Sequence, residues 1–304
     1  MSRFLPGLLF FIELSWQQKD PLNDFCRRFG HQSTVVDSRL YLDGGFVNWN
    51  PIAQNRQNYT SKTGSLLHSL PPDSSLDTWL LYNDLNTSPA GVGVPQLHAN
   101  LSKNASISDV SGGILWPDQV NKRFYLYGGD YSGITPNAPD LLSYDILNDN
   151  WDNFGRPGQS IGSVSWGGGV GISDLGEGYV LGGWLSNNSM PGWQGGPQAT
   201  STLIKFDMDS GTWTNNTGPD TIPRAEGVMV YLPASDSGLL VYFGGIAMPY
   251  SNNTMVDSPM SMIHVYDIRS SKWYAQTAAG DVPLSRRRFC AGAAWAPDQS
   301  SYNM

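Results

Sequence analysis

Three apolar stretches of this 304-residue chain each end in a pair of glycines: FYLYGGD at 124–130, YVLGGW at 179–184 and VYFGGI at 241–246. A loop of variable length follows each pair and leads to an aromatic residue with Asp directly after it. A Trp then stands seven residues beyond the aromatic residue in every copy. The three aromatic and Trp pairs are Tyr144 with Trp151, Phe206 with Trp213, and Tyr266 with Trp273. One spacing kept in three copies indicates a repeated structural unit.

Each unit is predicted to form four antiparallel β-strands, A to D. Strands A and B form an apolar hairpin. The glycine pair closes strand B, where the absence of side chains lets neighbouring backbones approach and permits positive φ. The aromatic–Asp pair lies on strand C and the Trp on strand D, with a turn of Asn, Asp, Ser and Gly between them. Sheets of this kind, repeated every ~50 to 60 residues, are typical of a β-propeller in which each sheet is one blade.

Glycine pairs followed by spaced aromatic and Trp residues make the chain resemble the kelch-repeat family of the galactose oxidase/kelch-like superfamily. It resembles in particular the ectodomain of fungal secreted or membrane-anchored kelch proteins. The resemblance implies an all-β fold, a kelch-type β-propeller of four-stranded antiparallel blades that is incomplete, with about four and a half blades present. The structural repeat residues would be Gly44, Gly45, Gly128, Gly129, Gly182, Gly183, Gly244, Gly245, Tyr144, Phe206, Tyr266, Trp151, Trp213 and Trp273.

The blades are expected at about 30–90, 112–154, 163–215 and 224–276, with a partial fifth blade from 286. The first blade is degenerate, because Pro89 rather than Trp stands seven residues after Tyr82. The C-terminal stretch CAGAAWAPDQSSYNM repeats the strand A pattern of GGILWPDQ, so we expect the chain to be the front part of a longer protein. Alternatively, residues 286–304 return to complete blade 1 and close a small ring, which a disulfide between Cys26 and Cys290 would suit.

The N-terminus combines Arg3 with an apolar run of about ten residues, well short of the ~20 that span a bilayer. Residues 1–18 are therefore predicted to be a signal peptide, with a buried N-terminal segment as the alternative. Acceptor triplets for N-glycosylation are more numerous than random placement would give, which favours the secretory pathway. Their asparagines are Asn58, Asn86, Asn100, Asn104, Asn187, Asn215 and Asn252. We expect a secreted or cell-surface protein, with a cytoplasmic protein as the alternative.

The residues that could carry catalysis are scattered. None of the four histidines has a partner at metal-ligand spacing, so neither a metal nor a cofactor is predicted. Copper oxidases that resemble galactose oxidase share the kelch-like fold, but the histidine pair near the end of such a domain is not visible here. The stretch DMDSGTW at 207–213 resembles the Asp box of sialidases only in part. The glycine-rich SWGGGVG at 165–171 is expected on strand A, where crowding near the ring axis accounts for its glycines.

A non-enzymatic recognition module is therefore expected, and an oxidase-like or sialidase-like enzyme is the less favoured alternative. A net charge of −8 argues against nucleic acid as a partner. The long B-to-C loops must crowd one face of the ring together, and all acceptor triplets except that of Asn86 fall on the same face. Aromatic residues in these loops are the candidates for binding a protein or carbohydrate ligand, unless they fold back over the ring. They are Trp49, Tyr59, Tyr131, Trp184, Trp193 and Tyr250.

An extracellular or cell-surface kelch propeller is thus the leading hypothesis, and an intracellular kelch adaptor is the second. No transmembrane segment is expected within this chain.

Overall fold

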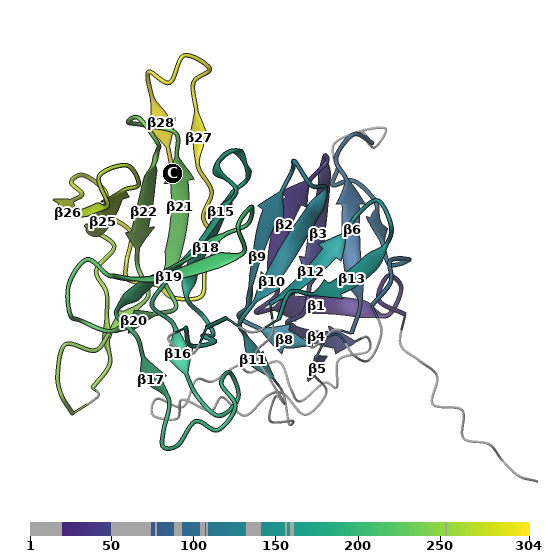
Figure 1. The fold of residues 1–304 in the computed structure, drawn as a ribbon, viewed down its shortest axis with the longest axis horizontal. Helices are drawn as coiled ribbons and strands as arrows, with labels where there is room; N and C mark the ends of the chain where they lie inside the picture. The colour runs from purple at the N-terminus through teal and green to yellow at the C-terminus, as the bar shows by residue number, and fades with distance from the viewer. Residues whose placement is uncertain are drawn as a thin grey trace, which may run out of the picture.

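The computed structural model describes residues 20–49, 74–76, 78–87, 93–103, 107, 109–131, 141–155, 157–158, 161–252 and 254–304. The predicted signal peptide at 1–18 lies outside them. The described chain is almost entirely β-structure, and its single short helical turn is η1 (Ser173–Leu175). Figure 1 shows two groups of sheets, with β2, β3, β9 and β10 in one half of the molecule and β15, β18, β21 and β22 in the other.

Four sheets of four antiparallel strands form the blades, and within each sheet the strands lie side by side in chain order. Blade 1 contains β2 (Gln32–Val36), β3 (Arg39–Asp43), β6 (Leu80–Asp84) and β7 (Leu97–His98). Blade 2 contains β9 (Ile114–Asp118), β10 (Arg123–Tyr127), β12 (Leu142–Asp145) and β13 (Asn150–Asn153). Blade 3 contains β14 (Gly168–Ile172), β15 (Glu177–Leu181), β18 (Thr202–Asp207) and β19 (Thr212–Thr217). Blade 4 contains β21 (Val228–Leu232), β22 (Leu239–Phe243), β25 (Met262–Asp267) and β26 (Lys272–Thr277).

A second layer of small sheets lies at one end of the blades, at the bottom of Figure 1. Its strands come from the segments just before strand A, just after the glycine pair and just before strand C. They are β1 (Phe25–Phe29), β4 (Phe46–Trp49) and β5 (Ser74–Leu76) under blade 1, and β8 (Val110–Ser111) with β11 (Asp130–Tyr131) under blade 2. Blade 3 has β16 (Trp184–Leu185) with β17 (Gln198–Ala199), and blade 4 has β20 (Arg224–Ala225), β23 (Ile246–Ala247) and β24 (Val256–Asp257).

The three repeat tryptophans occupy equivalent positions. In each C-to-D hairpin the aromatic residue of strand C is the direct partner of the Trp of strand D: Tyr144 with Trp151, Phe206 with Trp213, and Tyr266 with Trp273. Trp151 joins the apolar cluster between blades 1 and 2, Trp213 the one between blades 2 and 3, and Trp273 the one between blades 3 and 4. Each Trp therefore packs against the blade that precedes its own.

The indole nitrogens add polar links to the same interfaces. Trp151 Nε1 donates to the backbone oxygen of Ser102 at 2.7 Å, and Trp273 Nε1 donates to that of Thr217 at 3.0 Å. Both acceptors precede the blade that carries the Trp. Stacked blades are thus joined by apolar burial and by hydrogen bonds that also satisfy the indole N–H group.

Blade 1 departs from the repeat in a way that the sequence pattern did not reveal. Asn83 pairs with Leu40 as Tyr144 pairs with Phe124 in blade 2, so Asn83 rather than Tyr82 stands at the position of the repeat aromatic residue. Asn83 is in turn the partner of Leu97, which takes the place of the Trp. The outer strand of blade 1 is present as β7, but a longer C-to-D connection brings it in well after Pro89.

The glycine pairs lie where one blade touches the next. A Cβ on Gly128 would lie 2.1 Å from the backbone oxygen of Val164, and one on Gly182 would lie 2.3 Å from that of Arg224. Both glycines have φ of 68°. No L side chain fits such a contact without a shift of the backbone, and the conformation itself favours glycine. The recurring glycine pair is therefore required by the approach of neighbouring blades.

Crowding also explains the glycines of strand β14. A Cβ on Gly169 would lie 2.4 Å from Ile114 of blade 2, and one on Gly168 would lie 2.7 Å from the ring of Tyr242 in blade 4. Large side chains from both neighbouring blades thus fill the space that blade 3 leaves open.

The segment after blade 4 forms a hairpin of β27 (Ala294–Trp295) and β28 (Tyr302–Asn303), seen in yellow in Figure 1. Tyr302 and Ala293 pack against the apolar cluster on the face of blade 4. Among the described strands, those of this hairpin pair with each other and not with blade 1, so the alternative in which residues 286–304 complete blade 1 and close a small ring is wrong. Cys26 and Cys290 are free thiols, and the disulfide considered for that ring is not formed.

Candidate functional site

A ladder of backbone hydrogen bonds connects the repeats through one equivalent residue of each. These residues stand two positions before strand A in blades 1 to 4, and Arg288 takes the same role after blade 4. In every step the amide N–H of the later residue donates to the carbonyl oxygen of the earlier one, at 2.7 to 2.9 Å. All five have positive φ, between 53° and 67°. The members of this axial ladder are Gly30, Gly112, Trp166, Glu226 and Arg288.

Side chains of the axial ladder pack onto one another. The indole of Trp166 covers both Gly30 and Gly112, because an added Cβ would lie 2.7 Å and 2.5 Å from its ring atoms, respectively. The guanidinium of Arg288 lies over the indole, with its carbon 4.1 Å from the ring centroid. A guanidinium at this distance from an indole face is attracted by the π-system. Trp166 therefore bridges blades 1 and 2 on one side and the segment after blade 4 on the other.

Glu226 supplies the negative charge of this cluster. Its carboxylate is buried and accepts a hydrogen bond from Arg288 at 2.6 Å and one from Trp184 Nε1 at 3.2 Å. Arg287 adds a longer ion pair at 3.7 Å. A buried carboxylate is tolerated where it is paired and hydrogen-bonded in this way.

Asp130 lies on the other side of Trp166. It accepts a hydrogen bond from Trp166 Nε1 at 3.0 Å and one from Ser186 Oγ at 3.5 Å. Burial raises the pKa of this carboxyl above its ordinary value. Asp130, Trp166, Glu226 and Arg288 thus tie together four successive segments of the ring, and each of them finds its partner inside the cluster.

The sequence patterns did not reveal this axial cluster. Trp166 and Glu226 stand two positions before strand A, and Arg288 takes the same place in the ladder, but the side chains differ in every repeat and so leave no repeated letter. The distance to the following glycine pair also varies between repeats, so aligning the glycine pairs does not bring these residues to one position.

The loops below blades 3 and 4 rest on an apolar base. Trp184 and Ala199 from the small sheet of blade 3 pack with Ala225 and Ile246 from that of blade 4, and with Met248 directly after it. A bridge between Thr200 and Arg224 joins the two small sheets, and Met248 N donates to the oxygen of Pro223 at 2.9 Å. The B-to-C loops of these two blades therefore start from one shared, buried support.

The structure distributes the six candidate aromatic residues over very different environments. Trp184 is not exposed for binding: it is only 5% exposed and forms part of the apolar base, which agrees with the alternative that these aromatic residues fold back over the ring. Tyr131 is half-buried and packs against the cluster between blades 1 and 2. Trp193 is half-buried, with Nε1 donating to the oxygen of Gly196 at 3.0 Å, and Tyr250 is 59% exposed. The side chain of Trp49 and the whole of Tyr59 lie outside the described residues.

Described acceptor asparagines are all exposed: Asn86, Asn100, Asn187, Asn215 and Asn252. Asn58 and Asn104 lie outside the described residues. Asn187 and Asn252 are in the B-to-C loops of blades 3 and 4. Asn215 lies within the outer strand β19.

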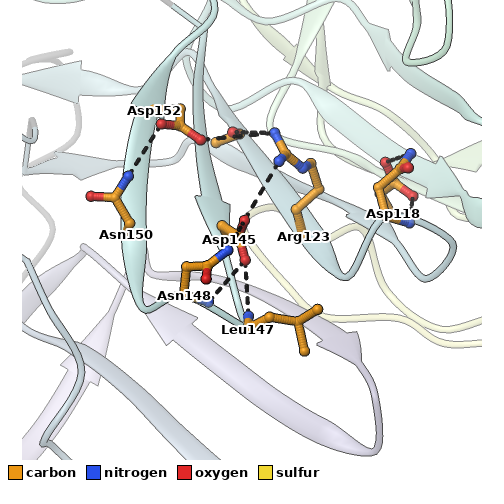
Figure 2. Close-up of polar contacts among 9 residues, drawn as sticks. Asp118, Arg123, Asp145, Leu147, Asn148, Asn150 and Asp152 are labelled. Atoms are coloured by element: carbon orange, nitrogen blue, oxygen red, sulfur yellow. Dashed lines mark hydrogen bonds and ion pairs between the residues drawn. The ribbon is translucent and has the colours of Figure 1, made fainter.

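Charged residues at the opposite end of the blades form local turn networks. Figure 2 shows Arg123 between Asp145 and Asp152. The N···O distances from its guanidinium to the two carboxylates are 3.7 and 4.0 Å, and Arg123 Nη1 also donates to Ser143 Oγ at 3.3 Å. Asp145 Oδ1 accepts the backbone N–H groups of Leu147 and Asn148 at 2.9 and 3.0 Å. These contacts fix the C-to-D turn of blade 2, and turn formation accounts for them.

Among the described residues, no group of three or more His, Cys, Asp or Glu side chains is placed to hold a metal ion. Within the same part of the chain, no helix has the length and apolar character needed to cross a bilayer.

Comparison with known proteins gives one informative similarity. The chain is 28% identical over 319 aligned residues to a kelch repeat-containing protein of Arthroderma benhamiae, and the match covers 91% of this chain. It covers 44% of that protein, so the chain spans less than half the length of this relative. No protein-family model matches the chain. The similarity and the four-stranded antiparallel blades together confirm the predicted fold class.

Proposed function

We propose that this kelch-repeat β-propeller is a non-enzymatic recognition module, which acts at the cell surface or outside the cell and binds its ligand through the B-to-C loops. The observation that carries the proposal is the buried apolar base of Trp184, Ala199, Ala225, Ile246 and Met248. It fixes the two loops that carry Trp193 and the exposed Tyr250. Loops held on a rigid support lose little conformational entropy when they bind, and exposed aromatic residues are effective anchors of recognition.

Exposure of the acceptor asparagines supports the extracellular location. All five that the structure describes are accessible, as modification by glycans requires. Their positions on loops and on the outer edge of a blade would keep glycans away from the interfaces between blades.

The location is tested by expressing the chain with its own N-terminus in a eukaryotic host with a secretory pathway. We expect the protein in the medium, shortened by the signal peptide, with an electrophoretic mobility that increases after endoglycosidase treatment. A product that stays in the cytosol with an intact N-terminus and no mobility change would contradict the extracellular assignment.

Recognition is tested with purified, fluorescently labelled protein and intact cells of the source organism. Replacing residues 186–197 by a Gly-Ser linker of equal length should abolish binding to the cell surface. The same replacement at residues 233–237, a turn at the opposite end of blade 4, is the matched control and should leave binding unchanged. Equal binding by both variants would show that the B-to-C loops do not carry recognition.

An intracellular adaptor is the second candidate, and the free thiols of Cys26 and Cys290 favour it. Unpaired cysteines are ordinary in a reducing compartment. The secretion experiment separates the two, because an adaptor would retain both thiols, carry no glycan and remain inside the cell.

A further inference from the structure

The two B-to-C loops of blades 3 and 4 differ in chemistry from the rest of the chain. Residues 184–200 contain no charged side chain, and residues 246–260 contain one, Asp257, in a chain whose net charge is −8. Their polar residues are mainly Asn, Gln, Ser and Thr. Loops of this composition offer hydrogen-bond donors and acceptors with almost no charge of their own, and they therefore fit a ligand with no charge.

Aromatic and amide groups are exposed on these loops. Tyr250 is 59% exposed in the blade 4 loop. In the blade 3 loop, Trp193 is half-buried, with its indole fixed by the hydrogen bond to Gly196, and Gln194 and Gln198 are exposed beside it. A fixed aromatic face binds the apolar C–H face of a sugar ring, while amide groups pair with its hydroxyls as both donor and acceptor.

Both loops leave the same support, which brings their bases together. Trp184 and Ala199 flank the blade 3 loop, and Ile246 and Met248 begin the blade 4 loop, all in one buried cluster. The amide N–H of Gly183 donates to the oxygen of Arg224 at 2.8 Å and fixes the two segments further. A ligand that reaches both loops would therefore meet a preformed surface.

We propose that this surface binds a neutral carbohydrate, with Trp193 and Tyr250 as the aromatic platforms and Gln194 and Gln198 as hydrogen-bonding groups. The proposal rests on the recognition role proposed above and names its ligand class. A protein partner fits less well, because protein surfaces carry charges that a neutral surface leaves unpaired when it covers them. Asn187 and Asn252 stand in the same loops, and glycans attached there would frame the surface.

The test is isothermal titration calorimetry of the full chain, deglycosylated with an endoglycosidase, against neutral hexasaccharides built from glucose, N-acetylglucosamine or mannose. Hexagalacturonate is the charged comparison. We expect at least one neutral hexasaccharide to bind with a Kd that is unchanged between low and high salt, because no charge pairing is involved. Hexagalacturonate should bind at least about tenfold more weakly, since each repeating unit adds a carboxylate that the surface cannot pair.

Two variants locate the site. Tyr250→Ala and Trp193→Ala should each weaken binding about tenfold or more. Tyr274→Ala is the matched control, because Tyr274 is 54% exposed but lies on the outer strand β26. Circular dichroism would establish that all three variants remain folded.

Three outcomes would overturn the proposal: no neutral hexasaccharide binds, hexagalacturonate binds as tightly as the neutral sugars, or both loop variants bind like wild type. If no sugar binds but the 186–197 replacement still abolishes binding to cells, the recognition role stands and the carbohydrate assignment falls. If no sugar binds and the 186–197 replacement leaves binding to cells unchanged, both the recognition role and the carbohydrate assignment are wrong.

Discussion

At the scale of single residues, the propeller depends on positions where a side chain is either forbidden or indispensable. Gly128 and Gly182 leave no room for a Cβ, since a backbone oxygen of the next blade occupies that place. Trp213 has the opposite role: its ring lies 5.9 Å from that of Trp116 and 5.3 Å from that of Tyr127, both in the preceding blade. The missing side chain of Gly128 and the large ring of Trp213 thus both contribute to the contact between blades 2 and 3.

Gly128→Ala tests the forbidden positions. The substitution adds a Cβ where φ is positive and where the oxygen of Val164 lies 2.1 Å away. We expect a loss of at least ~2 kcal/mol in the free energy of unfolding, because the left-handed conformation and the contact both oppose the methyl group. Chemical denaturation measures it. Gly292→Ala is the control, since nothing lies within 4 Å of that position, and a similar loss in both variants would contradict the explanation.

Trp213→Ala tests the indispensable ones. Removing the indole empties the contact between blades 2 and 3, and we expect a cost of ~3 kcal/mol, at the low end for large-to-small core changes because part of the ring is exposed. Denaturant unfolding followed by circular dichroism gives the value. Trp295→Ala, at an exposed position on β27, should change little. A loss below ~1 kcal/mol for Trp213→Ala would mean that the interface does not depend on the repeat tryptophan.

At the scale of elements, each C-to-D turn is built around the Asp that ends strand C. Asp84, Asp145, Asp207 and Asp267 each accept a backbone N–H from the turn that follows, at 2.8 to 3.0 Å. Hydrogen bonds from Ser210 lower the pKa of Asp207, and those from Asn148 do the same for Asp145. The Asp of the aromatic–Asp pair is thereby explained as a turn residue.

This arrangement predicts a pH dependence of stability. A carboxyl whose pKa is lower in the folded state stabilises the protein above its unfolded pKa of ~3.9, and the contribution is lost as the pH falls through the folded value. Asp207→Ala should therefore be less stable than wild type at pH 6, and the difference should shrink as the pH falls toward 2. Asp281→Ala, at an exposed position, is the control. A difference that stays constant with pH would refute the role of the charge.

The sequence predicted the elements well where residue identity is imposed by shape. The glycine pairs, the seven-residue spacing and the polar turns each follow from a steric or hydrogen-bonding requirement, and they recur in blades 2 to 4 of the structure. Blade 1 escaped the pattern because Asn83 and Leu97 replace the aromatic residue and the Trp. Buried Lys103 forms ion pairs with Asp43 at 2.7 Å and with Asp109 at 2.9 Å. The pair with Asp43 could not be predicted either, because no local sequence pattern indicates an ion pair between residues 60 positions apart.

The candidate binding site was predicted less well than the fold. Loop aromatic residues were identified by their position, but burial depends on what the neighbouring loop supplies. Trp184 is covered because Ala225, Ile246 and Met248 of the next blade pack against it, and single-chain periodicity carries no information about such neighbours. Tyr250, in the loop of the next blade, is 59% exposed.

At the scale of the whole molecule, the axial ladder holds successive blades in order. Trp166 fits because Gly30 and Gly112 leave space for its indole. The indole of the third repeat thus packs against the backbone of the first two. Glu226 and Arg288 then extend the same cluster toward the segment after blade 4.

A double-mutant cycle tests this shared packing. Gly112→Ala should lower the free energy of unfolding by ~2 kcal/mol or more, because φ is positive there and the added Cβ would lie 2.5 Å from the Trp166 ring. Combining it with Trp166→Gly should cost less than the sum of the two single losses, since the steric part vanishes with the indole. Thermal or denaturant unfolding of the four proteins gives the coupling. Strict additivity would show that the two residues act independently.

The axial ladder is made of amide and carbonyl groups, which every amino acid except proline carries in full. The link between consecutive repeats is therefore made by the backbone, and Gly, Gly, Trp, Glu and Arg occupy equivalent steps of it, although all five adopt a positive φ that β-branched residues disfavour. If a repeat is duplicated or deleted during evolution, the backbone hydrogen bond to the next repeat can still form. The side chains at these positions can then change according to the residues that surround each of them. The different side chains along the ladder are then the result of a link that is made by backbone atoms and that requires a residue able to adopt positive φ.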